Sequence, residues 1–255
     1  MRFTFLTLLL ALAGPALAAG CKAESGKTTA ALVELYTSEG CSSCPPADRW
    51  LSGLAARGFT PDRVVPLALH VDYWDYIGWK DPYAKREFSQ RQRKLSQLQR
   101  MALVYTPQVV LHGRDFRHWY TAEFDSAVAA INARPAQARI ALEILGVDRS
   151  ALDTRASATL AEPARAADAV LYLAVYENRL TSRVSAGENS GRTLTHDHVV
   201  LEWQGPFAFG PGGTVSERRA LALLPKGSPE RSGVVAFVQD RRTGEVLQAL
   251  LRSGC

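Results

Sequence analysis

The apolar positions of this chain follow two different periods, and the first half alternates between strand and helix patterns. Residues 30–37 and 64–71 are short, nearly continuous apolar runs closed by polar or turn residues, which is typical of buried strands. Apolar residues recur at helical spacing at 45–54 and at 122–133. A third helix is expected from Asp81–Pro82, an Asp cap followed by proline, to residue 102. With a further strand at 104–111, this alternation predicts a βαβ unit and a partly parallel sheet.

After Arg134–Pro135 the apolar period changes to two. Alternating runs separated by turn residues predict strands at 140–146, 155–160, 169–176, 198–203, 219–224 and 234–238. This spacing is typical of an antiparallel β-sandwich. After an N-terminal segment at 19–27, we therefore expect an α/β domain over residues 28–136 and an all-β, immunoglobulin-like sandwich domain over residues 137–255.

The first residues have the pattern of an export signal. Arg2, an apolar run at 3–13 and the small-residue motif ending at Ala18 predict a signal peptide over residues 1–18, cleaved near Ala18. Residues 18–21 also loosely resemble a lipoprotein cleavage box, so lipid attachment at Cys21 is the alternative. No later segment is long and apolar enough for a transmembrane helix. We therefore expect a periplasmic or secreted protein.

The charge balance changes this picture little. The chain has 30 Lys and Arg against 25 Asp and Glu, a net charge of +5, which raises the question of nucleic-acid binding. The one dense basic group lies on a single predicted helix: Lys85, Arg86, Arg91, Arg93, Lys94 and Arg100. A solvated helix face explains such a group, so we expect no nucleic-acid partner. Nothing in the pattern indicates an oligomeric state.

Export gives the four cysteines a clearer meaning. An even number in an oxidising compartment suggests two disulfides, for which three connectivities exist. Cys41 and Cys44 are separated by two residues, whereas Cys21 and Cys255 lie at the two ends of the mature chain. The economical pairing is therefore Cys41–Cys44 and Cys21–Cys255.

The position of Cys41 and Cys44 suits redox chemistry. The pair lies between a predicted buried strand and a predicted helix, where unpaired N–H groups and the helix dipole favour a thiolate. Cys41 is expected to be the more exposed and more acidic thiol, and Cys44 to resolve a mixed disulfide. Pro45 and Pro46 lack N–H groups, so a helix start at Cys44 or Pro45 is also compatible, with a weaker effect on Cys41.

A zinc site would need a second pair of ligands. The chain has no second CxxC, and its histidines lack a ligand-like spacing to the first: His70, His112, His118, His196 and His198. His196 and His198 alternate along a predicted strand, which suits a metal with a third ligand but also a solvated strand face. We expect no metal site and no dissociable cofactor.

From residue 28 to about 135 the chain resembles the thioredoxin-like superfamily, with strand, CxxC, helix, strand, helix and then Thr106–Pro107 before the next strand. The resemblance implies that Pro107 is a cis-proline facing the CxxC and that backbone beside it, at Thr106, pairs with the substrate. It also places Glu34 near the buried acid that assists proton transfer in thioredoxins. The chain departs from working thioredoxins in its Cys-Ser-Ser-Cys motif, which Gly40 precedes.

Two longer strings are similar to a bacterial family of secreted proteins of unknown function. They are VELYTSEGCSSCPPAD at residues 33–48 and SAGENSGRTLTH at residues 185–196. The resemblance spans nearly the whole mature chain and implies fold and compartment without an activity. The second string places Glu188, Asn189 and Arg192 in a Gly-rich loop, where these residue types suit either function or a turn.

An aromatic segment at residues 72–80 follows the second predicted strand. It contains Tyr73, Trp74, Tyr76 and Trp79. Because parallel strands end at the same edge of a sheet, this segment should lie beside the CxxC. The rings suit a lid over the local core, or an apolar groove in which Trp74 and Trp79 bind an extended partner.

These features together predict a thiol–disulfide oxidoreductase that acts on protein thiols or disulfides of the cell envelope. Cys41 would attack, Cys44 would resolve, Pro107 would face the substrate and Glu34 would accept a proton. Two alternatives remain open. One is a non-catalytic envelope binding protein in which Cys41–Cys44 staples a turn. The other is a copper-handling protein, because thiolates and a nearby histidine suit Cu(I).

Overall fold

The structure, a computed structural model, describes residues 21–254. The predicted signal peptide and Cys255 lie outside the described residues, and so does the predicted Cys21–Cys255 disulfide. The α-helices in this range are α1 (Cys44–Ser52), α2 (Arg86–Leu98) and α3 (Ala122–Asn132). Short 3-10 helices are η1 (Ala55–Arg57), η2 (Asp72–Ile77), η3 (Pro163–Arg165) and η4 (Pro229–Arg231). The strands are β1 (Cys21–Glu24), β2 (Ala31–Thr37), β3 (Val64–His70), β4 (Gln108–Leu111), β5 (Arg114–Asp115), β6 (Ala138–Val147), β7 (Ala151–Leu160), β8 (Ala169–Glu177), β9 (Leu180–Arg183), β10 (Thr193–His196), β11 (Val199–Ala208), β12 (Thr214–Ala222), β13 (Ser232–Asp240) and β14 (Val246–Ser253).

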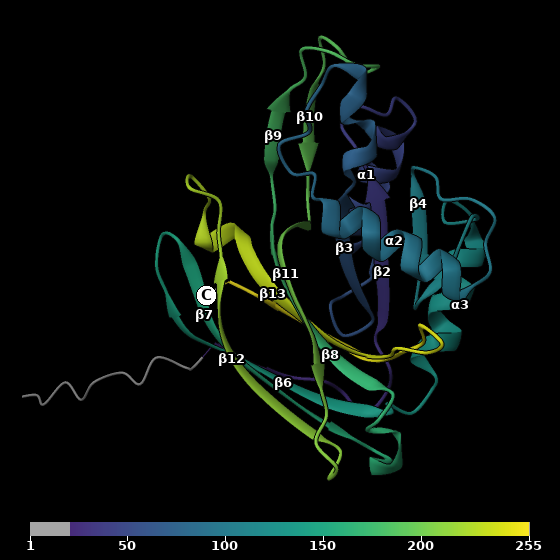
Figure 1. Ribbon diagram of the computed structural model, residues 1–255, viewed down its shortest axis with the longest axis vertical. Helices are drawn as coiled ribbons and strands as arrows, with labels where there is room; N and C mark the ends of the chain where they lie inside the picture. Colours follow the sequence, from purple (N-terminus) through teal and green to yellow (C-terminus); the bar gives the residue numbers. More distant parts are fainter. Residues whose placement is uncertain (1–20, 255) are drawn as a thin grey trace, which may run out of the picture.

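An eight-stranded sheet runs through both halves of the chain, in the order β14-β13-β8-β11-β3-β2-β4-β5 (Figure 1). β2 and β3 are parallel and end together at Thr37 and His70, as the βαβ pattern predicts. β4 is antiparallel to β2. β11 joins β3 in parallel through Val199 and Ala68. The boundary expected at residue 136 therefore does not separate two sheets.

Helices cover both faces of the β2–β3 part of this sheet. On one face, Phe88 and Leu95 of α2 pack in a core that includes Leu32 and Tyr36 of β2. On the other face, α1 and α3 share a core with the alternate residues of β2. Because successive strand residues point to opposite faces, residues of α1 and of α2 contact different side chains of the same strand.

The strands of the second half pack as two layers. The four-stranded sheet β1-β6-β7-β12 lies against β8, β11, β13 and β14 of the long sheet, with one apolar core between them. Side chains of β7 alternate between buried and less buried positions, whereas β8 and β13 are buried throughout because both of their faces are covered. Among the strands of residues 21–254, β9 and β10 pair only with each other, as an antiparallel hairpin. These two layers explain the period-two pattern of the second half of the chain. The long sheet, however, continues into β3, β2, β4 and β5 of the first half.

The helix expected from Asp81–Pro82 begins only at Arg86 and ends at Leu98. Asp81 does not cap it, because the Asp81 carboxylate is used elsewhere. It accepts hydrogen bonds from the N–H groups of Glu39 and Tyr83 and contacts the ring of His70. The predicted helix start was wrong because Asp81, which resembles a helix cap in the sequence, makes tertiary contacts instead.

The strand expected to carry both His196 and His198 is interrupted between them. β10 ends at His196, β11 begins at Val199, and His198 has a positive φ of 57°. The two rings therefore do not share a strand face. His198 packs on Tyr176, and burial lowers the pKa of His198 to about 4.

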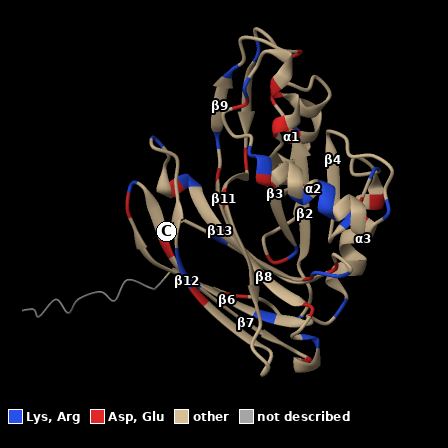
Figure 2. Cartoon of the chain, viewed as in Figure 1, with Lys and Arg blue, Asp and Glu red and all other residues tan. Residues whose placement is uncertain are grey.

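The basic group predicted on one helix is divided in the structure. Arg86, Arg93 and Lys94 are exposed on α2, and Figure 2 shows acidic and basic residues mixed over the rest of the chain. Arg100 lies beyond the end of α2, and Arg91 points inward. Of the helices within residues 21–254, none is long and apolar enough to cross a membrane.

Candidate functional site

Cys41 and Cys44 form a disulfide at the start of α1, with their Cα atoms 5.5 Å apart. β2 carries the chain to this point, and α1 begins at Cys44 with Ser43 as its N-cap residue. The later of the two predicted helix starts is therefore the correct one. Cys41 lies before the helix rather than in its first turn.

The start of α1 offers few backbone donors. Pro45 and Pro46 have no N–H group, and the Cys44 N–H donates to the carbonyl of Cys41 at 3.2 Å. The Ser43 hydroxyl lies 3.3 Å from the Cys41 sulfur. Stabilisation of a Cys41 thiolate would therefore come from Ser43 rather than from a ring of helix N–H groups.

Both cysteines are buried, with exposed fractions of 1% for Cys41 and 0% for Cys44. A clear difference in exposure, with Cys41 the more exposed thiol as predicted, is therefore not seen in this disulfide form. The side chains of Trp74 and Ile77 pack on Gly40, where an added Cβ would lie 3.3 Å from each. Ile77 also packs on Gly187, in the loop that joins β9 to β10. Segments from both halves of the chain thus close around the residue that precedes Cys41.

The β9–β10 loop also makes polar contacts with the cysteine segment. Asn189 is wholly buried, and its side-chain amide donates to the carbonyls of Glu39 and Cys41 at 2.9 Å each. The exposed Glu188 carboxylate accepts from the Ser42 N–H at 2.8 Å and from its hydroxyl at 2.7 Å. Of the three loop residues that the sequence singled out, these two contact the cysteine segment.

The Thr106–Pro107 bond is cis, as the resemblance implies. Gln108 pairs with Tyr36, so Pro107 lies at the level where β2 leads into the cysteine segment. The Trp74 indole donates to the Thr106 hydroxyl at 2.7 Å. Because Trp74 also packs on Gly40, its ring connects the cis-proline segment with the cysteines.

Most rings of the aromatic segment make hydrogen bonds to other parts of the chain. Trp79 donates to the Glu39 carboxylate at 2.8 Å, and the Tyr73 hydroxyl donates to Gln92 at 3.1 Å. Trp74 and Trp79 are half-buried, whereas Tyr76 is 83% exposed. The segment lies beside the CxxC, as the parallel pairing of β2 and β3 predicts, and Tyr76 is its most exposed ring.

Glu34 lies apart from the cysteines. Side chains alternate between the two faces of a strand, so Glu34 shares the face of Leu32 and Tyr36, which α2 covers. Helix α1 covers the opposite face. Its carboxylate accepts from Arg91 at 2.6 and 2.8 Å and from the Tyr36 hydroxyl at 2.8 Å. The Glu34 carboxylate is therefore engaged by Arg91 and Tyr36 on the face covered by α2. The structure therefore does not bring Glu34 to the redox pair.

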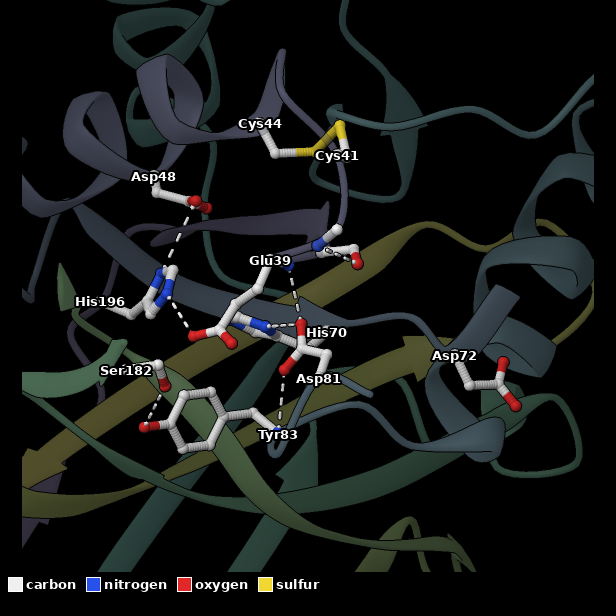
Figure 3. Close-up of polar contacts among 12 residues, drawn as sticks. Glu39, Cys41, Cys44, Asp48, His70, Asp72, Asp81, Tyr83, Ser182 and His196 are labelled. Carbon is white, nitrogen blue, oxygen red and sulfur yellow. Dashed lines mark hydrogen bonds and ion pairs between the residues drawn. A yellow bond between two sulfur atoms is a disulfide. The ribbon is translucent and has the colours of Figure 1, made fainter. Parts of the chain in front are cut away.

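A buried group of carboxylates and imidazoles lies on the α1 side of the sheet, near the disulfide (Figure 3). The Nε2 atom of His196 is 3.1 Å from Glu39, and its Nδ1 atom is 3.6 Å from Asp48. The Nδ1 atom of His70 is 2.7 Å from Asp81. We call Glu39, Asp48, His70, Asp81 and His196 the buried charge cluster.

The buried environment and the neighbouring charges shift three of these groups. Burial opposes charging of His70, but the Asp81 carboxylate outweighs it and raises the pKa of His70. Burial works against ionised Asp81 as well, yet His70 and two backbone N–H groups lower the pKa of Asp81. Burial raises the pKa of Asp48, although the nearby imidazoles oppose this. His70 and Asp81 therefore form an ion pair, whereas burial makes ionisation of Asp48 less favourable.

Sequence reasoning missed this cluster. Its members come from the β2–α1 loop, α1, β3, the segment after η2 and β10, so no sequence spacing connects them. One signal was available: Asp48 follows Cys44 by one helical turn and therefore shares its helix face. Within residues 21–254, no group of three or more His, Cys, Asp or Glu side chains is arranged to hold a metal ion.

Comparison with known proteins gives a family and a fold. Residues 32–239 match the family described as "Protein of unknown function (DUF1223)". No curated protein matches the chain. A crystal structure of protein AGR_C_4864 from Agrobacterium tumefaciens is similar, with 23% identity, 91% of this chain and 97% of that chain covered, and a TM-score of 0.66. HBP35 of Porphyromonas gingivalis is similar with 14% identity, 90% and 76% coverage and a TM-score of 0.69.

Proposed function

We propose that this chain, which belongs to the family of proteins of unknown function DUF1223, catalyses thiol–disulfide exchange through Cys41 and Cys44. The observation that carries the proposal is the Cys41–Cys44 disulfide at the start of α1, with the cis-proline Pro107 beside the end of β2. This arrangement supports the thioredoxin-like resemblance of residues 28–136. We place the reaction outside the cytoplasm because residues 1–18 have the pattern of a signal peptide.

The exchange proceeds in two displacements. A substrate thiolate attacks the Cys41 sulfur, the bond between Cys41 and Cys44 breaks, and Cys44 leaves as a thiolate that takes up a proton. A second thiolate of the substrate then attacks the mixed disulfide, so that the substrate leaves oxidised and both cysteines are reduced. The reverse sequence oxidises Cys41 and Cys44 and reduces a substrate disulfide.

Access to Cys41 requires a local opening. Cys41 is buried in the disulfide form, under the contacts of Ile77 with Gly40 and Gly187. The outer contact of this cover is the exposed pairing of Glu188 with Ser42. A substrate would have to displace the β9–β10 loop to reach the sulfur.

The same burial favours a second candidate function, a binding protein whose Cys41–Cys44 disulfide is structural. Burial limits the access of thiols to the bond, and a structural disulfide also has a reduction potential too low for glutathione to reduce it. The two proposals differ in a measurable quantity. We expect exchange with glutathione at a potential within the oxidoreductase range, whereas a structural bond has a potential below about −300 mV.

Trapping with variants tests the reaction directly. Cys44→Ser should accumulate mixed disulfides with envelope proteins, because a substrate bound to Cys41 is then not released. Cys41→Ser is the matched control and should trap none. A folded Cys44→Ser protein that traps no partner, together with a potential below that of glutathione buffers, would contradict the exchange function and support the structural one.

A further inference from the structure

His196 brings the second half of the chain into the redox site. It ends β10, and its ring lies between Glu39, two residues before Cys41, and Asp48, one helical turn after Cys44. Its exposed fraction is 2%, so water contributes little to its solvation. Figure 3 shows the His196 ring between Asp48 and Glu39, with the disulfide nearby.

The cluster has an excess of acidic groups. His70 and Asp81 balance one another as an ion pair at 2.7 Å. His196 then faces two carboxylates, those of Glu39 and Asp48, with only one imidazole. The other groups around it are the ring of His70 at 4.9 Å and the ring of Tyr83 at 6.0 Å. His196 can therefore share a proton with Glu39 and Asp48 in this part of the cluster.

Reduction of the neighbouring disulfide creates a need for that proton. In the disulfide form the sulfur atoms of Cys41 and Cys44 are uncharged. A thiolate left at Cys41, beside the Ser43 hydroxyl at 3.3 Å, would add a negative charge to the buried segment that also carries Glu39, two residues earlier. Charges interact strongly in such surroundings, because solvent does not screen them.

We propose that His196 is a positioning residue of the redox site, which holds a proton between Glu39 and Asp48 and so offsets the charge of the Cys41 thiolate. The inference rests on the proposed exchange function. When a substrate dithiol reduces the bond, its two electrons pass to the cysteines and the substrate forms a disulfide. Of its two protons, one goes to the Cys44 sulfur and the other to the cluster at His196.

Reciprocity makes the proposal measurable without a substrate. If a proton on His196 favours the reduced cysteines, reduction must favour the proton on His196 to the same degree. The imidazole should therefore keep its proton to a higher pH in the reduced protein. We expect the midpoint of its titration to rise by about one pH unit, which is a tenfold change in proton affinity.

NMR titration of the wild-type chain with labelled histidine provides the measurement, in the oxidised form and after reduction by a phosphine, between about pH 5 and pH 8. His196→Gln assigns the signal. His118, which is exposed and contacts Glu123 rather than the buried charge cluster, is the matched control and should not respond to reduction. Equal His196 midpoints in the two redox states would overturn the proposal.

A second measurement uses the equilibrium with glutathione. Loss of the extra proton in His196→Gln should change the pH dependence of the equilibrium constant by up to about tenfold per pH unit, whereas a purely structural role changes both redox forms alike. The control His118→Gln should behave as wild type. If Cys44→Ser traps partners but the equilibrium constants of His196→Gln and wild type depend on pH in the same way, only the proposed role of His196 is wrong. If the disulfide is reduced only on unfolding, the exchange function is wrong as well.

Discussion

At the scale of single residues, Asn189 shows why the site could be anticipated only in part. Its setting between glycines predicts a turn as well as it predicts a function. In the fold, its amide crosses to the other half of the chain and holds the carbonyls of Glu39 and Cys41. Cys41, Cys44 and Pro107 could be identified because their chemistry is local. The partners of Asn189 could not be identified, because Glu39 and Cys41 are 150 and 148 residues away from it in the sequence.

Asn189→Ala should lower the free energy of unfolding of the oxidised protein by about 1–3 kcal/mol, because a buried carbonyl loses its donor. Asn189→Asp should lower it at least as much, since a carboxylate of the same shape cannot donate. Ser190→Ala, at an exposed neighbouring position, is the control and should have little effect. Denaturant titration measures the three values, and an Asp variant as stable as wild type would contradict the role of the amide.

The His70–Asp81 pair predicts a pH window of stability. The pKa of Asp81 is lowered in the fold, so its contribution is present above its unfolded value of about 3.9 and is lost as pH falls through its folded value. The pKa of His70 is raised, so its contribution is complete below about 6.5 and is lost as pH rises through its folded value.

We therefore expect His70→Gln to destabilise the protein most between about pH 4 and pH 6.5, and less on either side. The measurement is the free energy of unfolding of wild type and variant across this range. His118→Gln removes an exposed histidine next to Glu123 and is the control. A stability difference that does not change with pH would show that His70 contributes through packing alone.

At the scale of elements, predictions succeeded where one segment carries its own signal. The continuous apolar runs correctly located β2 and β3, and the spacing at 122–133 located α3. β9, β10 and η2 are short, and their positions depend on contacts such as that of Ile77 with Gly40 and Gly187. α2 illustrates the same limit. Arg91 interrupts its apolar stripe because the residue is an internal ion-pair partner of Glu34.

The aromatic segment gives the element-scale prediction. Trp74 and Trp79 make hydrogen bonds inside the site, so Trp74→Ala and Trp79→Ala should lose stability as well as partner trapping. Tyr76 is 83% exposed on the same element and is the ring free to contact a partner. Tyr76→Ala in the Cys44→Ser background should therefore weaken trapping severalfold with an unchanged melting temperature.

Tyr120 offers a matched control for Tyr76, since it is 68% exposed and lies just before α3 rather than in η2. Tyr120→Ala should leave trapping unchanged. Equal trapping by the Tyr76 and Tyr120 variants would show that η2 does not contact the partner, and the groove hypothesis would be dropped.

At the scale of the whole molecule, the change of period near residue 136 was informative but incomplete. It correctly separated a βα-alternating half from an all-β half. It gave no sign that β11 would pair with β3 through Val199 and Ala68, because a single parallel bridge leaves no pattern in either strand. The contacts of Asn189 and His196 join the halves a second time, at the redox site.

This double connection predicts that the first half does not fold alone. A fragment of residues 21–136 would expose the edge of β3 where β11 pairs, and would leave Asp48 and Glu39 without His196. Unpaired strand edges and uncompensated buried carboxylates both destabilise a fold. We expect the whole chain to melt in one transition and the fragment to show none by circular dichroism. Adding a fragment of residues 137–255 should restore part of the signal. A cooperative transition in the first fragment alone would show that residues 28–136 are an independent domain, to which the second half is merely attached.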